Sequence, residues 1–281
     1  MNKQTWMMGT FFLGITLALA ACGGLRSATS GGVTPATTQG IITGFGSLFV
    51  DGVEYKVSSG TAISVDGRNA TESDLQVGML VTVRGIVDPS GNTGTAVSIE
   101  HTDQLEGVVT AAAVAADGTG SVIAMGQRVT LSADTVFASH VTGIDAPDRI
   151  KPGNVIQVSG YGSSDGAVTA TRIVVKEASR RPGEPIEVKG TISHLDATAG
   201  SFMLGDLSVD YHVLSAGTLP AIGLANGQYV EVSTTAPLTG SGALIAGRIQ
   251  LVDDGLRGHE GIPGEALEVK GLVTADLANG Q

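Results

Sequence analysis

A Gly-x-Ser-x-Gly pattern at residues 162–166 is the first candidate for chemistry, because it sets a serine between two glycines as a nucleophile elbow does. An elbow needs a strand before the serine and a helix after it. Here the segments on both sides alternate apolar and polar residues, which is typical of strands. Gly- and Ser-rich segments recur at the equivalent positions 89–94 and 239–242. We therefore predict a hairpin turn at residues 162–166, without a catalytic residue.

The histidines are the second candidate, since imidazole can bind a metal or transfer a proton. They make no i,i+2 or i,i+4 pair with one another, whereas metal sites need clustered ligands. His101 with Asp103, and His259 with Glu260 and Asp254, would each offer two or three ligands. No Asp-Gly step has the spacing of an EF-hand loop. We predict polar surface residues in loops, and no metal, cofactor or catalytic group, for all five histidines: His101, His140, His194, His212 and His259.

The N-terminal residues have the pattern of a secretory signal. Lys3 precedes an apolar run at residues 6–21, which is too short to span about 30 Å of hydrocarbon comfortably. The run ends in a tetrapeptide that resembles the lipobox of bacterial lipoproteins: Leu19, Ala20, Ala21 and Cys22. The resemblance implies that a signal peptide, residues 1–21, is cut before Cys22 and that this cysteine carries lipid. The alternative is an ordinary signal peptide in which Cys22 is incidental.

A lipid anchor would place the mature chain in the cell envelope. Gly23 after the cysteine implies passage to the outer membrane, by the sorting rule of enteric bacteria. With the one cysteine acylated, neither a disulfide nor thiol catalysis is expected. Residues 22–39 are rich in Gly, Ser and Thr without apolar periodicity, which predicts a flexible tether to the membrane.

The composition indicates a folded, acidic protein. Charged residues make up 15% of the chain against 42% hydrophobic ones, which does not fit a disordered chain. The 27 acidic and 16 basic residues give a net charge of -11, which repels phosphate backbones. We therefore expect no nucleic-acid partner, and a membrane contact made through the lipid.

Internal repeats organise the rest of the chain. Residues 182–190 and 263–271 are identical at seven of nine positions, and a Gly-plus-apolar register recurs at 78–85, 153–160 and 227–232. These matches predict three β-barrel repeats, at residues 40–104, 105–179 and 186–254, and an incomplete fourth at 265–281. A lone strand cannot bury its own apolar side. Either the sequence is a piece of a longer protein, or this strand adds to a sheet edge in the same molecule or in a partner.

Each repeat shows the period-two pattern of half-buried strands. Val53, Tyr55 and Val57 alternate with polar residues, and Asp-Gly pairs such as Asp51-Gly52 predict turns between strands. One short helix per repeat is expected, in the first at residues 72–76 behind an N-cap at Thr71. About five strands and one short helix per repeat predict an all-β chain of tandem small barrels, in an order that resembles the OB fold.

Two segments of the first repeat carry a family resemblance. Residues 42–52, with Gly-Phe-Gly-Ser, and residues 74–85, with Gly-x-x-Val-x-Val, are similar to the bacterial domain of unknown function 5666, which occurs in tandem in proteobacterial lipoproteins. The second repeat lacks Gly-Phe-Gly-Ser, and the third keeps mainly Gly-x-x-Val-x-Val. The resemblance implies a fold and an envelope location, and it brings no catalytic residues.

The opening strand holds the candidate binding residues. Phe45 and Phe49 share one face of residues 42–50, and Ile42 lies on the other. If the Ile42 face is the core, the two phenylalanines form an exposed patch for a glycan or a partner protein. The alternative is a strand buried on both sides at a corner of the barrel. We expect a lipid-anchored, non-enzymatic binding or structural module; the alternatives are an envelope glycan-binding module and, third, a hydrolase with a site between repeats.

Overall fold

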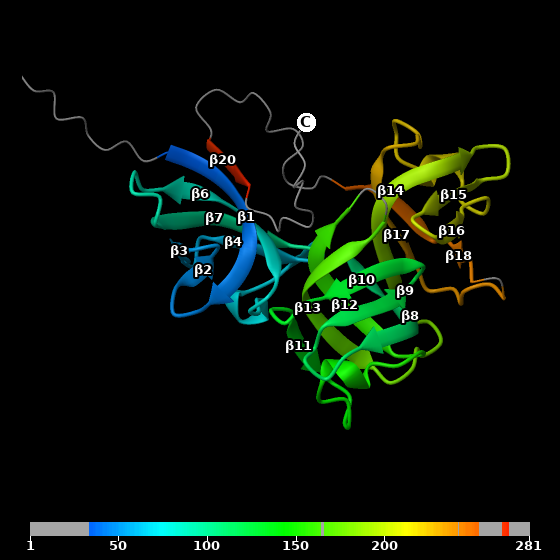
Figure 1. Ribbon diagram of the computed structural model, residues 1–281. Helices are drawn as coiled ribbons and strands as arrows, with labels where there is room; N and C mark the ends of the chain where they lie inside the picture. Colours follow the sequence, from blue (N-terminus) through cyan, green and yellow to red (C-terminus); the bar gives the residue numbers. More distant parts are fainter. Residues whose placement is uncertain (1–33, 164–165, 241, 253–265, 270–281) are drawn as a thin grey trace, which may run out of the picture. The chain divides into compact units, whose positions relative to one another are not determined.

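The computed structural model describes residues 34–163, 166–240, 242–252 and 266–269, and this part of the chain is all-β (Figure 1). The predicted signal peptide and Cys22 lie outside the described residues. Within the described part, no helix is long and apolar enough to cross a membrane. Two hydrophobic cores form, one inside the first repeat and one shared by the second and third.

Five strands of the first repeat close into a barrel. β1 pairs with β2, β2 with β3, β3 with β7, β7 with β6, and β6 again with β1. The pairing between β3 and β7 is parallel and the other four are antiparallel. The strands are β1 (Thr34–Gly44), β2 (Leu48–Val50), β3 (Val53–Lys56), β6 (Leu80–Val87) and β7 (Thr93–His101).

The period-two pattern places the apolar residues inside this barrel, as predicted. Val53 and Tyr55 on β3 are buried, while Glu54 and Lys56 between them face solvent. The Tyr55 hydroxyl donates a hydrogen bond to Thr38 Oγ1 at 2.7 Å, so its polar end is satisfied inside the core.

Asp-Gly pairs form the predicted turns. Asp51-Gly52 joins β2 to β3, and Asp66-Gly67 joins β4 (Ala62–Val65) to β5 (Arg68–Asn69). All four residues have positive φ, between 46° and 84°, as a two-residue hairpin of right-handed twist requires. The second of these turns matters most here, because it holds the Asp66 side chain beside the end of β7.

The prediction of one short helix per repeat is wrong. Residues Glu72–Asp74 form a single 3-10 turn, η1, and the other repeats have similar turns, η2 (Pro147–Arg149) and η3 (Ala216–Thr218). The Thr71 N–H donates to Asp74 Oδ2 at 2.8 Å, which fixes the start of η1. Leu75 then returns to extended backbone and buries its side chain. The helix therefore stops after one turn, before further hydrogen bonds can offset the entropy lost in forming that turn.

The second repeat has the same circuit of pairings. β8 pairs with β9, β9 with β10, β10 in parallel with β13, β13 with β12, and β12 with β8. Its strands are β8 (Leu105–Val114), β9 (Gly120–Ala124), β10 (Gln127–Leu131), β11 (Val136–Ser139), β12 (Val155–Gly162) and β13 (Val168–Glu177).

The third repeat joins the second through its first strand. β14 pairs with β8 at Glu187 and Val188, which makes one twelve-stranded sheet of the two repeats. β14 also pairs with β15 and β17, β16 with β15 and β18, and β19 with β17. The strands are β14 (Ile186–Asp196), β15 (Ser201–Leu204), β16 (Leu207–Asp210), β17 (Tyr229–Thr234), β18 (Leu244–Ile245) and β19 (Arg248–Leu251).

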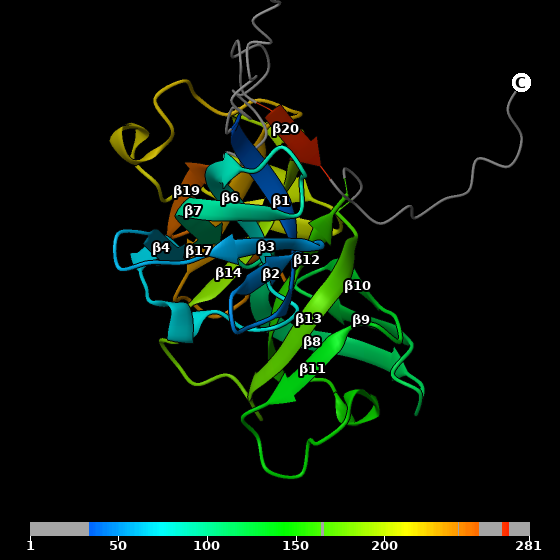
Figure 2. The same cartoon turned by 90° about the vertical axis from the view of Figure 1, so that its left-hand side faces the viewer.

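The segment predicted as an incomplete fourth repeat contributes one described strand. β20 (Ala266–Val269) runs parallel to β1, with Ala36 opposite Ala266 and Gln39 opposite Val269. Both views show β20 beside β1 (Figures 1 and 2). Of the arrangements open to a lone strand, the structure shows addition to a sheet of the same molecule.

Candidate functional site

The predicted opening strand is two strands joined by a turn, and this turn presents Phe45. β1 ends at Gly44, the backbone reverses through Gly46 at φ +122°, and β2 begins at Leu48. Ile42 is fully buried, Phe45 is 42% exposed and Phe49 is half-buried. Burial on both sides, the alternative considered for this segment, is therefore wrong for Phe45.

A hollow lies beside the Phe45 ring. It is shallow and open to solvent, with a volume of about 450 Å³, and we call it the Phe45 groove. Its other walls come from the η1 turn and the residues after it. The lining residues are Phe45, Glu72, Ser73, Leu75 and Gln76.

A largely buried polar cluster lies at the C-terminal end of β7. We call it the polar junction, and its members are Asp66, His101, Asp103, Gln157 and Lys189. Its members come from the β4–β5 turn, the last residue of β7, the connector to β8, and strands β12 and β14. His101 is fully buried, and Asp103 and Lys189 are 4% and 2% exposed. The prediction that His101 and Asp103 are polar surface residues in a loop is therefore wrong.

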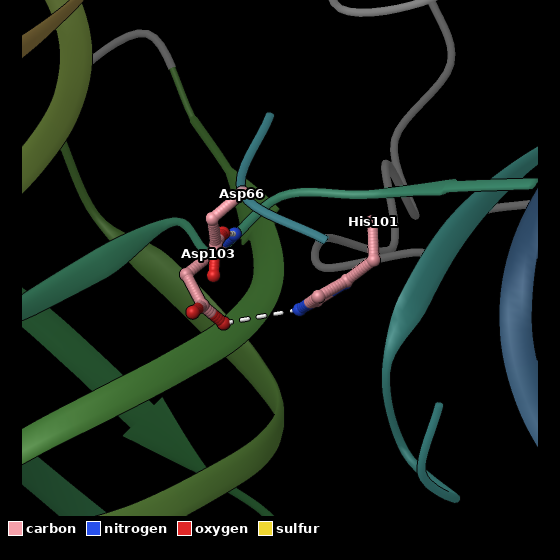
Figure 3. A group of neighbouring side chains, drawn as sticks. All are labelled: Asp66, His101 and Asp103. Atoms are coloured by element: carbon pink, nitrogen blue, oxygen red, sulfur yellow. Dashed lines mark hydrogen bonds and ion pairs between the residues drawn. The ribbon is translucent and has the colours of Figure 1, made fainter. Parts of the chain in front are cut away.

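The two ring nitrogens of His101 face different partners. Nδ1 lies 2.8 Å from the Leu80 carbonyl oxygen, which can only accept, so Nδ1 carries a hydrogen. Nε2 lies 3.1 Å from Asp103 Oδ1 (Figure 3). Two lone pairs at this distance would repel each other, so a proton or another cation must lie between them.

The aspartates of the junction are held from several sides. The Asp103 N–H donates to Asp66 Oδ1 at 2.8 Å, and the Gln157 side-chain amide donates to Asp103 Oδ2. Figure 3 shows the His101 ring pointing toward Asp103, with Asp66 beside Asp103. One ligand atom from each of Asp66, His101 and Asp103 lies within 4.8 Å of the other two. This group can therefore offer a metal ion one nitrogen and two oxygens.

Burial and neighbouring charges shift the pKa values of residues in the junction. Burial raises the pKa of Asp66 to about 6, and the nearby charge of Asp103 adds to the effect. Burial by itself would lower the pKa of His101, but the hydrogen bond to Asp103 and the charge of Asp103 outweigh it and raise that pKa. Both shifts favour the protonated form of the residue, which is neutral for Asp66 and positively charged for His101.

Lys189 connects the third repeat to this cluster. Its ammonium donates to the Asp103 carbonyl oxygen and to Glu187 Oε1 at 2.9 Å, and it lies 3.4 Å from Glu231 Oε2. Burial disfavours the charge, yet the two glutamates outweigh it and the pKa of Lys189 is raised. The positive charge of Lys189 is thus already matched by Glu187 and Glu231.

The other sequence candidates are not brought together. Gly162 is the last residue of β12, and the N–H of Ser163 donates to the Ala167 carbonyl at 2.8 Å just before β13, as in a hairpin loop. Ser164 and Asp165 lie outside the described residues, as do His259, Glu260 and Asp254. His194 is exposed, and exposed His212 pairs with Asp210 on the third repeat.

The described chain is thus an all-β protein with a closed five-stranded barrel and a buried polar cluster at its end. Residues 38–100 and 106–174 each match the family model described as Domain of unknown function (DUF5666), so this part of the chain carries that domain twice in tandem. Comparison of the chain with curated proteins and with solved structures gives no significant match.

The junction is the feature that sequence reasoning missed. His101 and Asp103 were noticed as a pair, but their burial depends on residues far away in the sequence. The available signal was local: Asp103 follows two residues after His101, at the end of a predicted strand, and an Asp-Gly turn at Asp66 precedes them. Nothing in the spacing shows that this turn lies against that strand end.

Proposed function

We propose that this protein is a non-catalytic binding module of the cell envelope, held at the membrane by lipid on Cys22. The anchor rests on the Leu-Ala-Ala-Cys tetrapeptide after an apolar run, and two or three acyl chains would give stable attachment. The observation that carries the binding role is the exposed Phe45 ring beside a hollow of about 450 Å³.

We further propose that the three repeats are OB-like barrels. In the first repeat, the order around the barrel is β1, β2, β3, β7 and β6, and β3 and β7 are parallel. Numbered along the chain, the five barrel strands thus follow the order 1-2-3-5-4. This is a five-stranded Greek-key circuit, the architecture of the OB fold. The second repeat supports the proposal through the same circuit, and the third through a similar one with its last strand divided into β18 and β19.

The location of the Phe45 groove agrees with a binding role for such a barrel. OB folds bind ligands on the face of the second and third strands and at the loop between the first and second. Phe45 lies in the loop between β1 and β2, the first and second strands of its barrel. An aromatic ring beside a hollow offers a ligand a large apolar surface to contact.

An envelope glycan is the second candidate for the ligand, and the groove's composition favours it. The aromatic ring of Phe45 offers an apolar surface, while Glu72, Ser73 and Gln76 offer a carboxylate, a hydroxyl and an amide at its edge. Sugar rings present both apolar C–H faces and hydroxyls, which match these groups. A partner protein would use the ring as a hydrophobic anchor.

The hydrolase alternative has weaker support. It requires two carboxylates that flank a substrate. Asp66 and Asp103 do come together, but Asp103 is 4% exposed, and its carboxylate is engaged by His101 and Gln157. A substrate bond cannot reach a carboxylate in that position without displacing the junction.

Crosslinking of the lipidated protein in living cells, followed by mass spectrometry, tests the binding role. We expect one defined envelope protein, or glycan fragments without a protein, and Phe45→Ser should abolish the capture while leaving the melting temperature within a few degrees. The double variant Phe45→Ser/Phe49→Ser should also remain folded. A large loss of thermal stability in Phe45→Ser, or unchanged capture, would refute the binding patch.

The anchor needs its own test. Wild-type protein should take up a labelled fatty acid and sediment with outer membranes, whereas Cys22→Ser should do neither. Labelling that persists in Cys22→Ser would show that the lipid assignment is wrong.

A further inference from the structure

The polar junction has the composition and geometry of a metal site. We propose that Asp66, His101 and Asp103 bind a divalent transition-metal ion, with Zn²⁺ as the principal candidate. The three residues differ from those that line the Phe45 groove, and the proposal does not depend on the binding role proposed for Phe45.

The distances already approach those of a zinc centre. Zinc binds His nitrogen and carboxylate oxygen at about 2.0–2.2 Å, which puts neighbouring ligands of a tetrahedron about 3.3–3.5 Å apart. His101 Nε2 and Asp103 Oδ1 are 3.1 Å apart, and the third ligand atom, from Asp66, lies within 4.8 Å of both. Asp66 sits on a hairpin turn and is partly exposed, so a side-chain rotation can close the remaining gap.

The imidazole is set in the orientation of a metal ligand. A ligating histidine usually donates its second ring N–H to a carbonyl or carboxylate, which fixes the tautomer and aims the other nitrogen at the metal. His101 does this through Nδ1 and the Leu80 carbonyl, at 2.8 Å. Its Nε2 lone pair is thereby directed at Asp103, an acceptor, and this arrangement requires a cation between the two atoms.

Groups outside the triad support the carboxylates in the same way. Gln157, from β12, donates to the Asp103 oxygen that does not face His101. Hydrogen-bonded ligand carboxylates are the rule at metal centres, because the outer partner orients the ligand. Asp103 is therefore held in position by a residue that would not itself touch the ion.

With the imidazole neutral, as a metal ligand must be, the local charge matches a divalent ion. Lys189 is the buried cation nearest the Asp103 backbone, but Glu187 and Glu231 already match its charge. Two aspartates and a neutral imidazole then carry a charge of about -2, which one divalent cation balances. A nitrogen ligand beside carboxylates favours zinc over calcium, which prefers oxygen ligands throughout.

Zinc titration of the metal-stripped full chain tests this. All proteins carry Cys22→Ser, so that no thiol competes for the metal, and affinity is measured by competition with a chromogenic chelator. We expect one Zn²⁺ per chain. Asp66→Asn keeps an oxygen that can accept the Asp103 N–H but loses the ligand charge, and it should bind zinc at least tenfold more weakly.

The chain supplies a matched control. Asp210 lies beside His212 as Asp103 lies beside His101, but this pair is exposed, and it belongs to no three-residue ligand group among the described residues. Asp210→Asn should bind zinc like the parent. Equal affinities for Asp66→Asn and the parent would overturn the proposal, as would the absence of zinc binding by the folded parent, which would show that a proton alone bridges His101 and Asp103.

Two further measurements decide the case if Asp66→Asn does not fold. Gln157→Leu leaves all three ligands and removes the outer hydrogen bond to Asp103, and it should weaken zinc binding about 10–100-fold. X-ray absorption of the parent zinc complex should show one imidazole with oxygen ligands at about 2.0–2.2 Å. Two or more imidazoles in that spectrum, or no effect of Gln157→Leu, would overturn the assignment.

Discussion

Replacement of Lys189 by methionine should strongly destabilise the protein. Lys189 is 2% exposed, and its ammonium contacts the Asp103 carbonyl, Glu187 and Glu231. Methionine fills a similar volume without charge. The variant would therefore leave a carbonyl without this donor and two partly buried carboxylates without their cation.

The magnitude follows from burial. Breaking a buried ion pair by removing one partner costs about 3–5 kcal/mol, because the remaining charge stays desolvated. A lysine in a solvent-exposed pair contributes about 0–1 kcal/mol. Lys176 supplies a comparison with a less buried lysine, since its ammonium lies 3.7 Å from Glu106 and its side chain is 31% exposed, against 3% for Lys189. We expect Lys189→Met to lower the free energy of unfolding by about 3–5 kcal/mol and Lys176→Met by no more than about 1 kcal/mol.

Urea unfolding at pH 7, followed by circular dichroism, measures both effects. Addition of Glu231→Gln to Lys189→Met should restore part of the loss, because it removes one uncompensated carboxylate. In the parent, Glu231→Gln should cost less, since Glu187 still pairs with Lys189. A loss below about 1 kcal/mol for Lys189→Met, or equal losses for the two lysines, would refute the reasoning from burial.

Two further predictions concern the strand ladder and pH. A Cβ at Gly85 would lie 2.3 Å from the Thr95 carbonyl oxygen across the bulge between β6 and β7, so Gly85→Ala should cost about 1–3 kcal/mol in urea unfolding. Gly217→Ala, with open space around it, should stay within about 0.5 kcal/mol of the parent, and similar losses for both would contradict the steric argument. Burial raises the pKa of Glu106 above 4.5 despite Lys176, so the parent loses stability as pH rises from 4.5 through that folded pKa. Glu106→Gln lacks this loss, so it should be more stable than the parent at pH 7. The difference in stability between the two proteins should shrink below pH 4.5. A difference that does not change with pH would contradict this prediction.

Local sequence patterns determined the strands and many of the turns. The alternation around Val53 and Tyr55 specifies a half-buried strand because successive side chains of a strand point to opposite faces. Asp51-Gly52 and Asp66-Gly67 specify turns because these residues adopt positive φ at little cost. The repeats of these signals along the chain made the tandem all-β organisation readable, and the family match agrees with it.

The same local reasoning failed at the helix and at Phe45. A helical pattern of five residues is too short to fix a helix, and burial of Leu75 ended it after one 3-10 turn. Glycines at 44 and 46 allowed either a coiled strand or a reversal. The pairing of β1 with β2 selected the reversal and exposed Phe45.

Only the tertiary structure decided the polar junction. Sequence placed His101 and Asp103 near each other, but their burial depends on Asp66, Gln157 and Lys189, which belong to other strands and turns. A buried charge is tolerated where partners are present, and these partners come from segments as many as 86 residues apart in the sequence. The sequence therefore determined which segments become strands, and packing determined which of their polar residues meet in a largely buried cluster.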